Sequence, residues 1–183
     1  MSLSPSEAQS ALKDIEKTEN RTAASQHGRH AAPHLIMWGI VWMIGYAVSA
    51  ARADMSWLWA PLTIGGVIGS VILGYLANKG ERNDFGRRYG LSFIGIFMFV
   101  AGVLFVMQPA TSAGVGAFIP LVVGHYYFLV GVWTRGWRML PLGVAITLLT
   151  LVGHFILPEY FGYWMAAVGG GGLILGGLWL RSV

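Results

Sequence analysis

The chain has 183 residues, of which 55% are apolar and 11% are charged, and its mean hydropathy is +0.61. Soluble domains carry roughly 25% charged residues, so this composition excludes an ordinary soluble domain and indicates an integral membrane protein. The absence of cysteine excludes disulfides and thiolate metal sites. Membrane topology accounts for the net charge of +4, so no nucleic-acid partner is expected.

The N-terminal segment 1–33 is polar and lacks the apolar stretch of a cleavable signal peptide. Ser4, Pro5 and Glu7 form a capping box, which predicts a short amphipathic helix over residues 4–25. We expect this helix to contact a cytoplasmic protein partner or the membrane surface. The linker 25–34 holds three histidines but is broken by glycine and proline, and we expect no metal there.

Residues 34–183 form the predicted transmembrane domain, an all-α bundle of six spanning helices. Each apolar segment is long enough to cross about 30 Å of hydrocarbon at about 1.5 Å per residue. The predicted spans are residues 34–51, 56–77, 89–108, 113–134, 138–158 and 160–180.

The distribution of Lys and Arg predicts the orientation of the bundle. With six spans, eleven of the twelve basic residues fall on one side of the membrane and only Arg52 falls on the other. Positive charge is retained on the cytoplasmic side. The sequence therefore predicts a multi-pass protein of the bacterial inner membrane with both termini in the cytoplasm.

Small residues recur every four positions in the second and sixth spans. This spacing allows close helix packing, within one chain or between two copies, so a homo-oligomer through these glycine-rich helices is one hypothesis. The predicted packing residues are Gly66, Ser70 and Gly74 in the second span and Gly172 and Gly176 in the sixth.

Polar side chains in the second, fourth and fifth spans are the candidate ligand-binding residues. Lipid cannot satisfy a polar group, so we expect these three helices to line the interior of the bundle. The candidates are Ser70, His125, Tyr126, Thr147, Thr150 and His154. A histidine bonded to a carbonyl, Thr or Tyr is the structural alternative to a functional role.

Motifs of hydrolases, zinc proteases and phosphate-binding loops are missing from the sequence, which favours a protein without enzymatic activity or cofactor. The leading hypothesis is a membrane protein that binds a small apolar ligand or a protein partner. A small transporter or permease subunit with a polar path is the second hypothesis. An intramembrane enzyme or haem protein using His125 and His154 is the third.

Size and span number are similar to those of vitamin-binding membrane subunits of bacterial import systems. Ala47 and Ala51 provide the small-residue spacing with which such subunits dock. No residue role is carried over from this similarity.

Overall fold

The computed structural model describes residues 31–77, 84–107, 112–133 and 138–182, together with Gln9 and Asp14. Gln9 and Asp14 are helical and exposed, and the rest of the predicted helix 4–25 lies outside the described residues. Within the described part, five helices are long and apolar enough to cross a membrane, and Ile94–Val106 is a shorter apolar helix. The predicted all-α membrane fold is confirmed.

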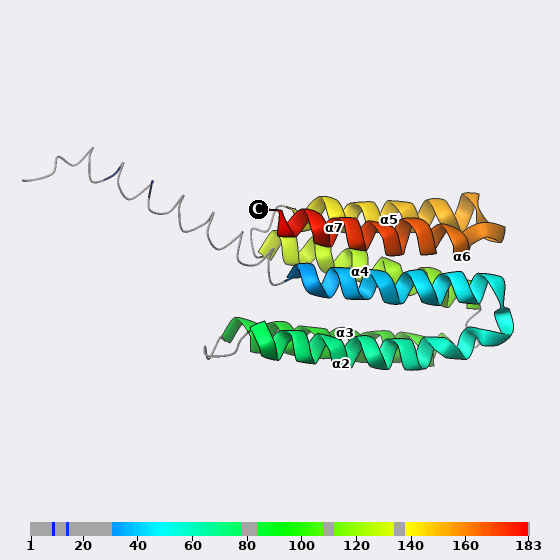
Figure 1. The fold of residues 1–183 in the computed structure, drawn as a ribbon, viewed down its shortest axis with the longest axis horizontal. Coiled ribbons are helices and arrows are strands. Elements are labelled where there is room, and N and C mark those ends of the chain that lie inside the picture. The colour runs from blue at the N-terminus through cyan, green and yellow to red at the C-terminus, as the bar shows by residue number, and fades with distance from the viewer. Residues whose placement is uncertain are drawn as a thin grey trace, which may run out of the picture.

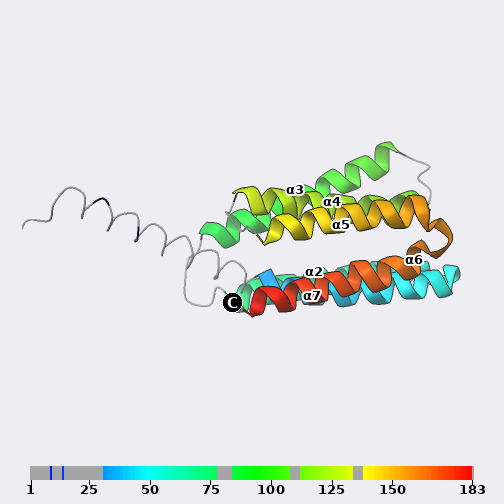
Figure 2. The same cartoon turned by 90° about the horizontal axis from the view of Figure 1, so that it is seen from above.

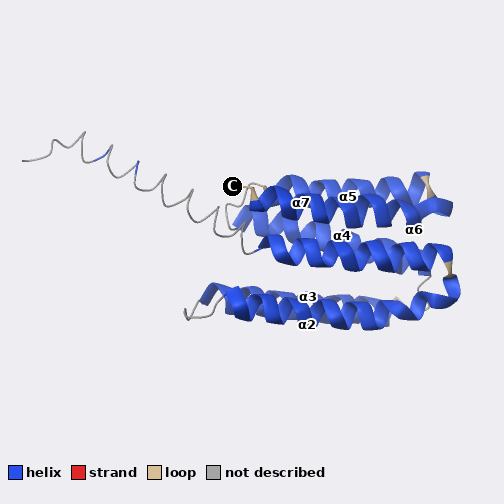
Figure 3. Ribbon diagram, viewed as in Figure 1, coloured by secondary structure: helices blue, strands red, loops and turns tan. Residues whose placement is uncertain are grey.

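The described part of the chain is almost entirely helical, as Figure 3 shows. The first described helix is Ala31–Ala51. It is followed by a 3-10 segment Ala53–Leu58, α2 Trp59–Ala77, α3 Asp84–Val106, α4 Ser112–Trp133 and α5 Met139–Ile156. The last crossing is composite and consists of a 3-10 turn Pro158–Tyr160, α6 Phe161–Trp164, a π-helical segment Met165–Gly170 and α7 Gly171–Arg181.

The helices form two layers (Figures 1 and 2). One layer contains α2, the Ala31–Ala51 helix and α7, and the other contains α3, α4 and α5. The Ala31–Ala51 helix and α4 occupy the middle of their layers, whereas α2 and α5 lie at opposite corners. The start of the Ala31–Ala51 helix and the end of α7 lie at the same end of the bundle.

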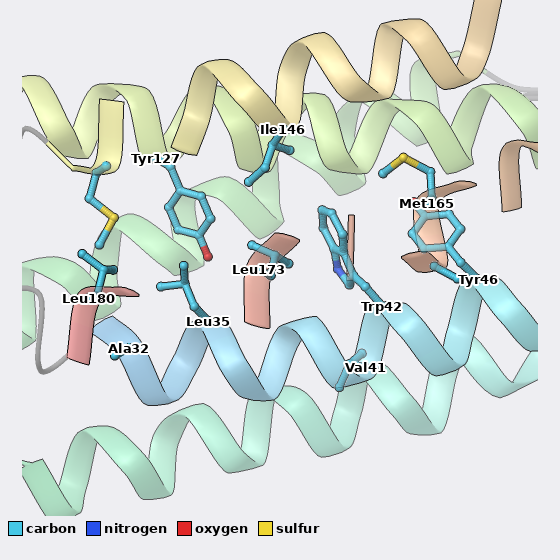
Figure 4. Close-up of a cluster of buried hydrophobic side chains, with 12 residues drawn as sticks. Ala32, Leu35, Val41, Trp42, Tyr46, Tyr127, Ile146, Met165, Leu173 and Leu180 are labelled. Atoms are coloured by element: carbon cyan, nitrogen blue, oxygen red, sulfur yellow. The ribbon is translucent and has the colours of Figure 1, made fainter. Parts of the chain in front are cut away.

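The core lies between the Ala31–Ala51 helix, α4, α5 and the C-terminal crossing (Figure 4). Leu35, Met165, Leu173 and Thr150 are almost completely buried, and Tyr127 reaches in from α4. Among the described residues, the buried members of this core include none from α2 or α3. Burial of apolar side chains therefore holds four of the crossings together more strongly than the other two.

Candidate functional site

The seam between α4 and α5 is built on direct contact between backbones. A Cβ atom added to Gly143 would lie 2.5 Å from the carbonyl oxygen of Gly124 and 2.6 Å from the backbone nitrogen of Phe128. A Cβ added to Gly124 would lie 2.6 Å from Oγ1 of Thr147. Backbone atoms cannot swing aside as a side chain can, so these two helices are fixed against each other.

A second seam of the same kind joins the Ala31–Ala51 helix to the C-terminal crossing. A Cβ at Gly39 would lie 2.7 Å from the Gly170 carbonyl oxygen, and one at Gly170 would lie 2.7 Å from the Met43 backbone nitrogen. At Gly177 the nearest atoms include the Ala32 carbonyl oxygen at 2.9 Å. Small residues permit this approach, which supplies packing energy where lipid gives no hydrophobic driving force.

A hydrogen bond from Tyr46 ties the two layers together at a carbonyl that α4 itself leaves open. Pro120 lies inside α4 and has no N–H to donate to the carbonyl of Gly116 four residues earlier. The Tyr46 hydroxyl donates to that same Gly116 oxygen over 2.6 Å. The bond satisfies a backbone group that would otherwise be orphaned in an apolar surrounding.

Trp164 makes a comparable link between α5 and the C-terminal crossing. Its Nε1–H donates to the Leu149 carbonyl oxygen over 2.8 Å. Gly153 leaves room for the indole, since a Cβ there would lie 2.5 Å from Cδ1 of Trp164. The Ala31–Ala51 helix, α4, α5 and the Pro158–Arg181 crossing are thus joined by backbone seams and part-buried hydrogen bonds. We call them the four-helix unit.

The contacts of α2 with this unit are of a different kind, because they are made by the ends of long side chains. Gly66 faces the ring of Trp38, with 3.0 Å from an added Cβ to Cη2, and Gly69 faces the sulfur of Met37. The Trp38 Nε1–H donates to Oγ of Ser70 over 3.0 Å. Such side chains can change rotamer, so this contact can adjust where the two backbone seams cannot.

Near the other end of the bundle, Trp59 of α2 repeats this arrangement. Its ring lies against Gly45, and its Nε1–H donates to the Ser49 hydroxyl over 2.9 Å. The ring also meets Tyr46 edge-on at a centroid distance of 4.9 Å, and Tyr46 meets Phe161 at 6.1 Å. The α2 helix is therefore anchored to the Ala31–Ala51 helix by two indole hydrogen bonds.

The structure places His125 on the outside of the bundle, contrary to the expectation that it faces the interior. Its side chain is exposed, whereas Gly124 and Tyr127 on the same helix are buried. The small residue Gly124 sets the packed face of α4, and His125 lies about 100° further around the helix. The prediction that His125 faces the interior rests on its polarity alone. It does not take into account that the neighbouring Gly124 is the residue that packs against α5.

His154 and the two threonines are not gathered into one polar site. Thr147 and Thr150 donate to carbonyl oxygens of their own helix, those of Gly143 and Ile146, over 2.9 and 2.7 Å. His154 is half-buried in the last turn of α5, with its ring 6.0 Å from that of Phe161. Since His125 points outward, the two histidines do not face each other as axial haem ligands would.

Ser70 is separated from the α5 candidates, because α2 and α5 occupy opposite corners (Figures 1 and 2). A single interior lined by α2, α4 and α5 is therefore not the arrangement found. Tyr126 is half-buried with its hydroxyl oxygen enclosed. Whether Ser70, Tyr126 or the other candidates bind a ligand stays a prediction.

The predicted packing glycines divide into two groups. Gly66 packs on Trp38, and Gly176 packs on Leu142, with 3.0 Å from an added Cβ to Cδ1. A Cβ added to Gly74 or Gly172 would meet no atom within 4 Å, so close packing inside the chain does not explain these two. The sequence analysis did not identify Trp38, Tyr46 or Pro120 as packing residues. For Pro120 a signal was available, because a proline inside an apolar helix leaves a carbonyl oxygen without its donor.

Two interactions of charged side chains lie at opposite ends of the bundle. Arg52 and Asp54 form an exposed ion pair of 3.0 Å in the connection before α2. At the other end the guanidinium of Arg138 lies 4.9 Å above the ring of Trp179. In the described part of the chain, no group of three or more acidic, histidine or cysteine side chains is placed to hold a metal ion.

The comparison with protein families gives one match. Residues 8–134, which are more than half of the chain, match the family described as "Sugar (and other) transporter". No curated protein and no solved structure matches the chain. The match favours the transporter hypothesis over ligand or partner binding, and it differs from the vitamin-binding subunits that size and span number resemble. The chain is a multi-pass membrane protein that belongs to the sugar (and other) transporter family.

Proposed function

We propose that the chain moves a small polar solute across the bilayer by displacing α2 and α3 relative to the four-helix unit. The observation that carries this proposal is the difference between the contacts of α2, made by Trp38 and Met37, and the backbone seams at Gly124 and Gly170. Alternating access requires one part of a transporter to move against another around a fixed site. We place that motion at the adjustable contact between α2 and the Ala31–Ala51 helix.

The side chains beside this contact suit a solute path. Ser70 and the indole of Trp38 supply a hydroxyl and an N–H donor between α2 and the Ala31–Ala51 helix. Half-buried Thr63 lies seven residues before Ser70, on the same face of α2. The α5 threonines lie outside this path, because α2 and α5 occupy opposite corners of the bundle (Figures 1 and 2). The path therefore differs from the one first expected along α2, α4 and α5.

Uptake into proteoliposomes tests the proposal, with a panel of labelled sugars and other small polar solutes as probes. Met37→Cys combined with Gly69→Cys allows a short bis-methanethiosulfonate linker to join α2 to the Ala31–Ala51 helix. We expect the linker to reduce uptake at least tenfold, and a reducing agent to restore it. The chain has no cysteine of its own, so the reagent has no other target.

The matched control joins two crossings that both belong to the four-helix unit. Leu142→Cys with Gly176→Cys places the same linker between α5 and α7, where Leu142 and Gly176 are in contact. Uptake should be unchanged by this linker. Equal inhibition by both linkers would contradict a moving α2, and no uptake of any probe above protein-free liposomes would contradict transport.

We further propose that the protein lies in the bacterial inner membrane with both termini in the cytoplasm. The excess of Lys and Arg in alternate connections supports this orientation. Arg138 and Arg181 lie at the end of the bundle where the Ala31–Ala51 helix begins (Figure 1), so these basic residues share one side. Arg52, at the other end, is paired with Asp54.

A further inference from the structure

His125 lies well inside the apolar length of α4. It is eight residues from Trp133, or about 12 Å, and thirteen from Ser112, or about 20 Å. Its side chain therefore lies about 4 Å from the midpoint of the helix, within hydrocarbon about 30 Å thick. The described residues give this exposed ring no hydrogen bond.

The face that carries His125 is otherwise apolar and continues onto α5. His125, Leu129 and Val132 lie on one side of α4 at helical spacing, and all three are exposed. On α5, which runs antiparallel to α4, exposed Val144 and Leu148 have the corresponding position. His125 and Val144 each follow a glycine of the α4–α5 seam. In two antiparallel helices, the residues that follow facing glycines lie on the same side of the pair. Both groups of exposed residues therefore lie on the side opposite the core.

This outer face is rigid, which favours its use as an interface. The close approach of Gly124 and Gly143 holds the two helices at a fixed spacing. A surface that is already ordered loses little conformational freedom on binding. Gly176 and Gly177 of α7, by contrast, are buried within the chain and are not available to a partner.

We propose that the outer face of α4 and α5, centred on His125, binds the same face of a second copy of this chain. An unpaired imidazole is unfavourable in hydrocarbon, and lipid tails offer neither a donor nor an acceptor. Neutral histidine carries one donor nitrogen and one acceptor nitrogen, so it can pair with its own kind. Two copies with the same orientation place His125 at the same depth on either side of a two-fold axis.

Disulfide trapping in native membranes tests this arrangement without background, because the chain contains no cysteine. After oxidation, we expect Leu129→Cys, which lies one turn from His125 on the same exposed face and keeps the histidine, to give a band at twice the monomer mass. Ile68→Cys is the control, since Ile68 is exposed at mid-length on α2, away from the proposed interface. A strong dimer band for Leu129→Cys with little for Ile68→Cys supports the proposal, and equal or absent bands overturn it.

Counting copies of the wild-type chain in lipid by single-molecule photobleaching gives a second readout. Two bleaching steps are expected, and one step for the wild type overturns the proposal. His125→Leu should lower the two-step fraction at least fivefold, whereas His125→Gln, which keeps a donor and an acceptor, should preserve it. A two-step fraction that His125→Leu leaves unchanged would show that the copies meet elsewhere and would overturn the interface.

Discussion

At the scale of single residues, Tyr46 and Pro120 depend on each other. The proline withholds an N–H from the Gly116 carbonyl, and the tyrosine hydroxyl of the opposite layer supplies the missing donor. A buried carbonyl without a partner costs free energy. The loss of stability on removing the Tyr46 hydroxyl therefore depends on whether residue 120 is a proline. The free energies of the two substitutions should therefore not be additive.

Tyr46→Phe should lower the free energy of unfolding by about 1 kcal/mol, because the Gly116 carbonyl loses its donor. In a Pro120→Ala background, where the substituted residue provides a backbone N–H, the loss of the tyrosine hydroxyl should cost distinctly less. The apparent Tm of the four purified proteins in detergent measures this coupling. An equal loss in both backgrounds would show that Pro120 does not leave the carbonyl open. Tyr75→Phe, on an exposed tyrosine, is the neutral control.

At the scale of helices, two kinds of contact divide the bundle. Where backbones meet, as at Gly124 and Gly143, a single added methyl group has no space. Where Trp38 and Met37 rest on α2, the contacting atoms are at the ends of side chains that can turn away. The first kind fixes spacing between helices, and the second permits small displacements.

Gly143→Ala should therefore destabilise the protein by about 1–3 kcal/mol, since the new methyl group meets backbone atoms that cannot move locally. Gly171→Ala is the matched control, because a Cβ there meets no atom within 4 Å. Size-exclusion chromatography after stepwise heating measures the thermal stability of both variants as the fraction that stays monodisperse. Equal monodisperse fractions of the two variants at every temperature would contradict the claim that the α4–α5 seam stabilises the protein.

At the scale of the whole molecule, the arrangement of ends constrains topology. The Ala31–Ala51 helix begins and α7 ends on the same side of the bundle, while the connection before α2 lies on the other side (Figure 1). Any orientation that exposes one of these sides to the cytoplasm exposes the other to the exterior.

Single cysteines introduced at the two ends should report opposite sides of the membrane. With a membrane-impermeant maleimide on intact spheroplasts, Ser56→Cys should be labelled and Ser182→Cys should be labelled only after lysis. Both serines are exposed, and the chain has no other thiol. Labelling of Ser182→Cys on intact cells would reverse the proposed orientation.

The sequence predicted much of the fold because apolar length and charge are written directly along the chain. The predicted spans and the helices found differ by a few residues, as at the second span, where a 3-10 segment Ala53–Leu58 precedes α2. The face that each helix turns inward was harder to predict. In α4 almost every side chain is apolar, so hydropathy does not distinguish the lipid side from the core side.

The candidate site was predicted less well for the same physical reason. Polar residues are expected to turn inward, and Thr150 is indeed buried, but its hydroxyl donates to the Ile146 carbonyl of its own helix. His125, by contrast, is exposed. The better guide to packing is the distribution of glycines, because helix backbones approach most closely where side chains are smallest. Gly124 and Gly143 form the α4–α5 seam, and a Cβ added to Gly131 would lie 2.9 Å from the backbone nitrogen of Leu140. Which small residues meet across a seam is a property of the fold and cannot be deduced from spacing alone.

The π-helical segment Met165–Gly170 sets the rotational register of the final crossing. A π-helical turn accommodates one residue more than an α-helical turn, so everything after it is rotated by about 100°. This rotation allows Trp164 before the segment and Leu173 after it to face the interior together. Losing one residue from the glycine run would convert the segment to α-helix and leave Leu173, Gly176 and Leu180 facing the core, because the deletion removes the one residue that the π-helical turn accommodates. Natural variation in this stretch should therefore tolerate the loss of one residue, whereas an α-helix of unchanged length would turn these three residues away from the core.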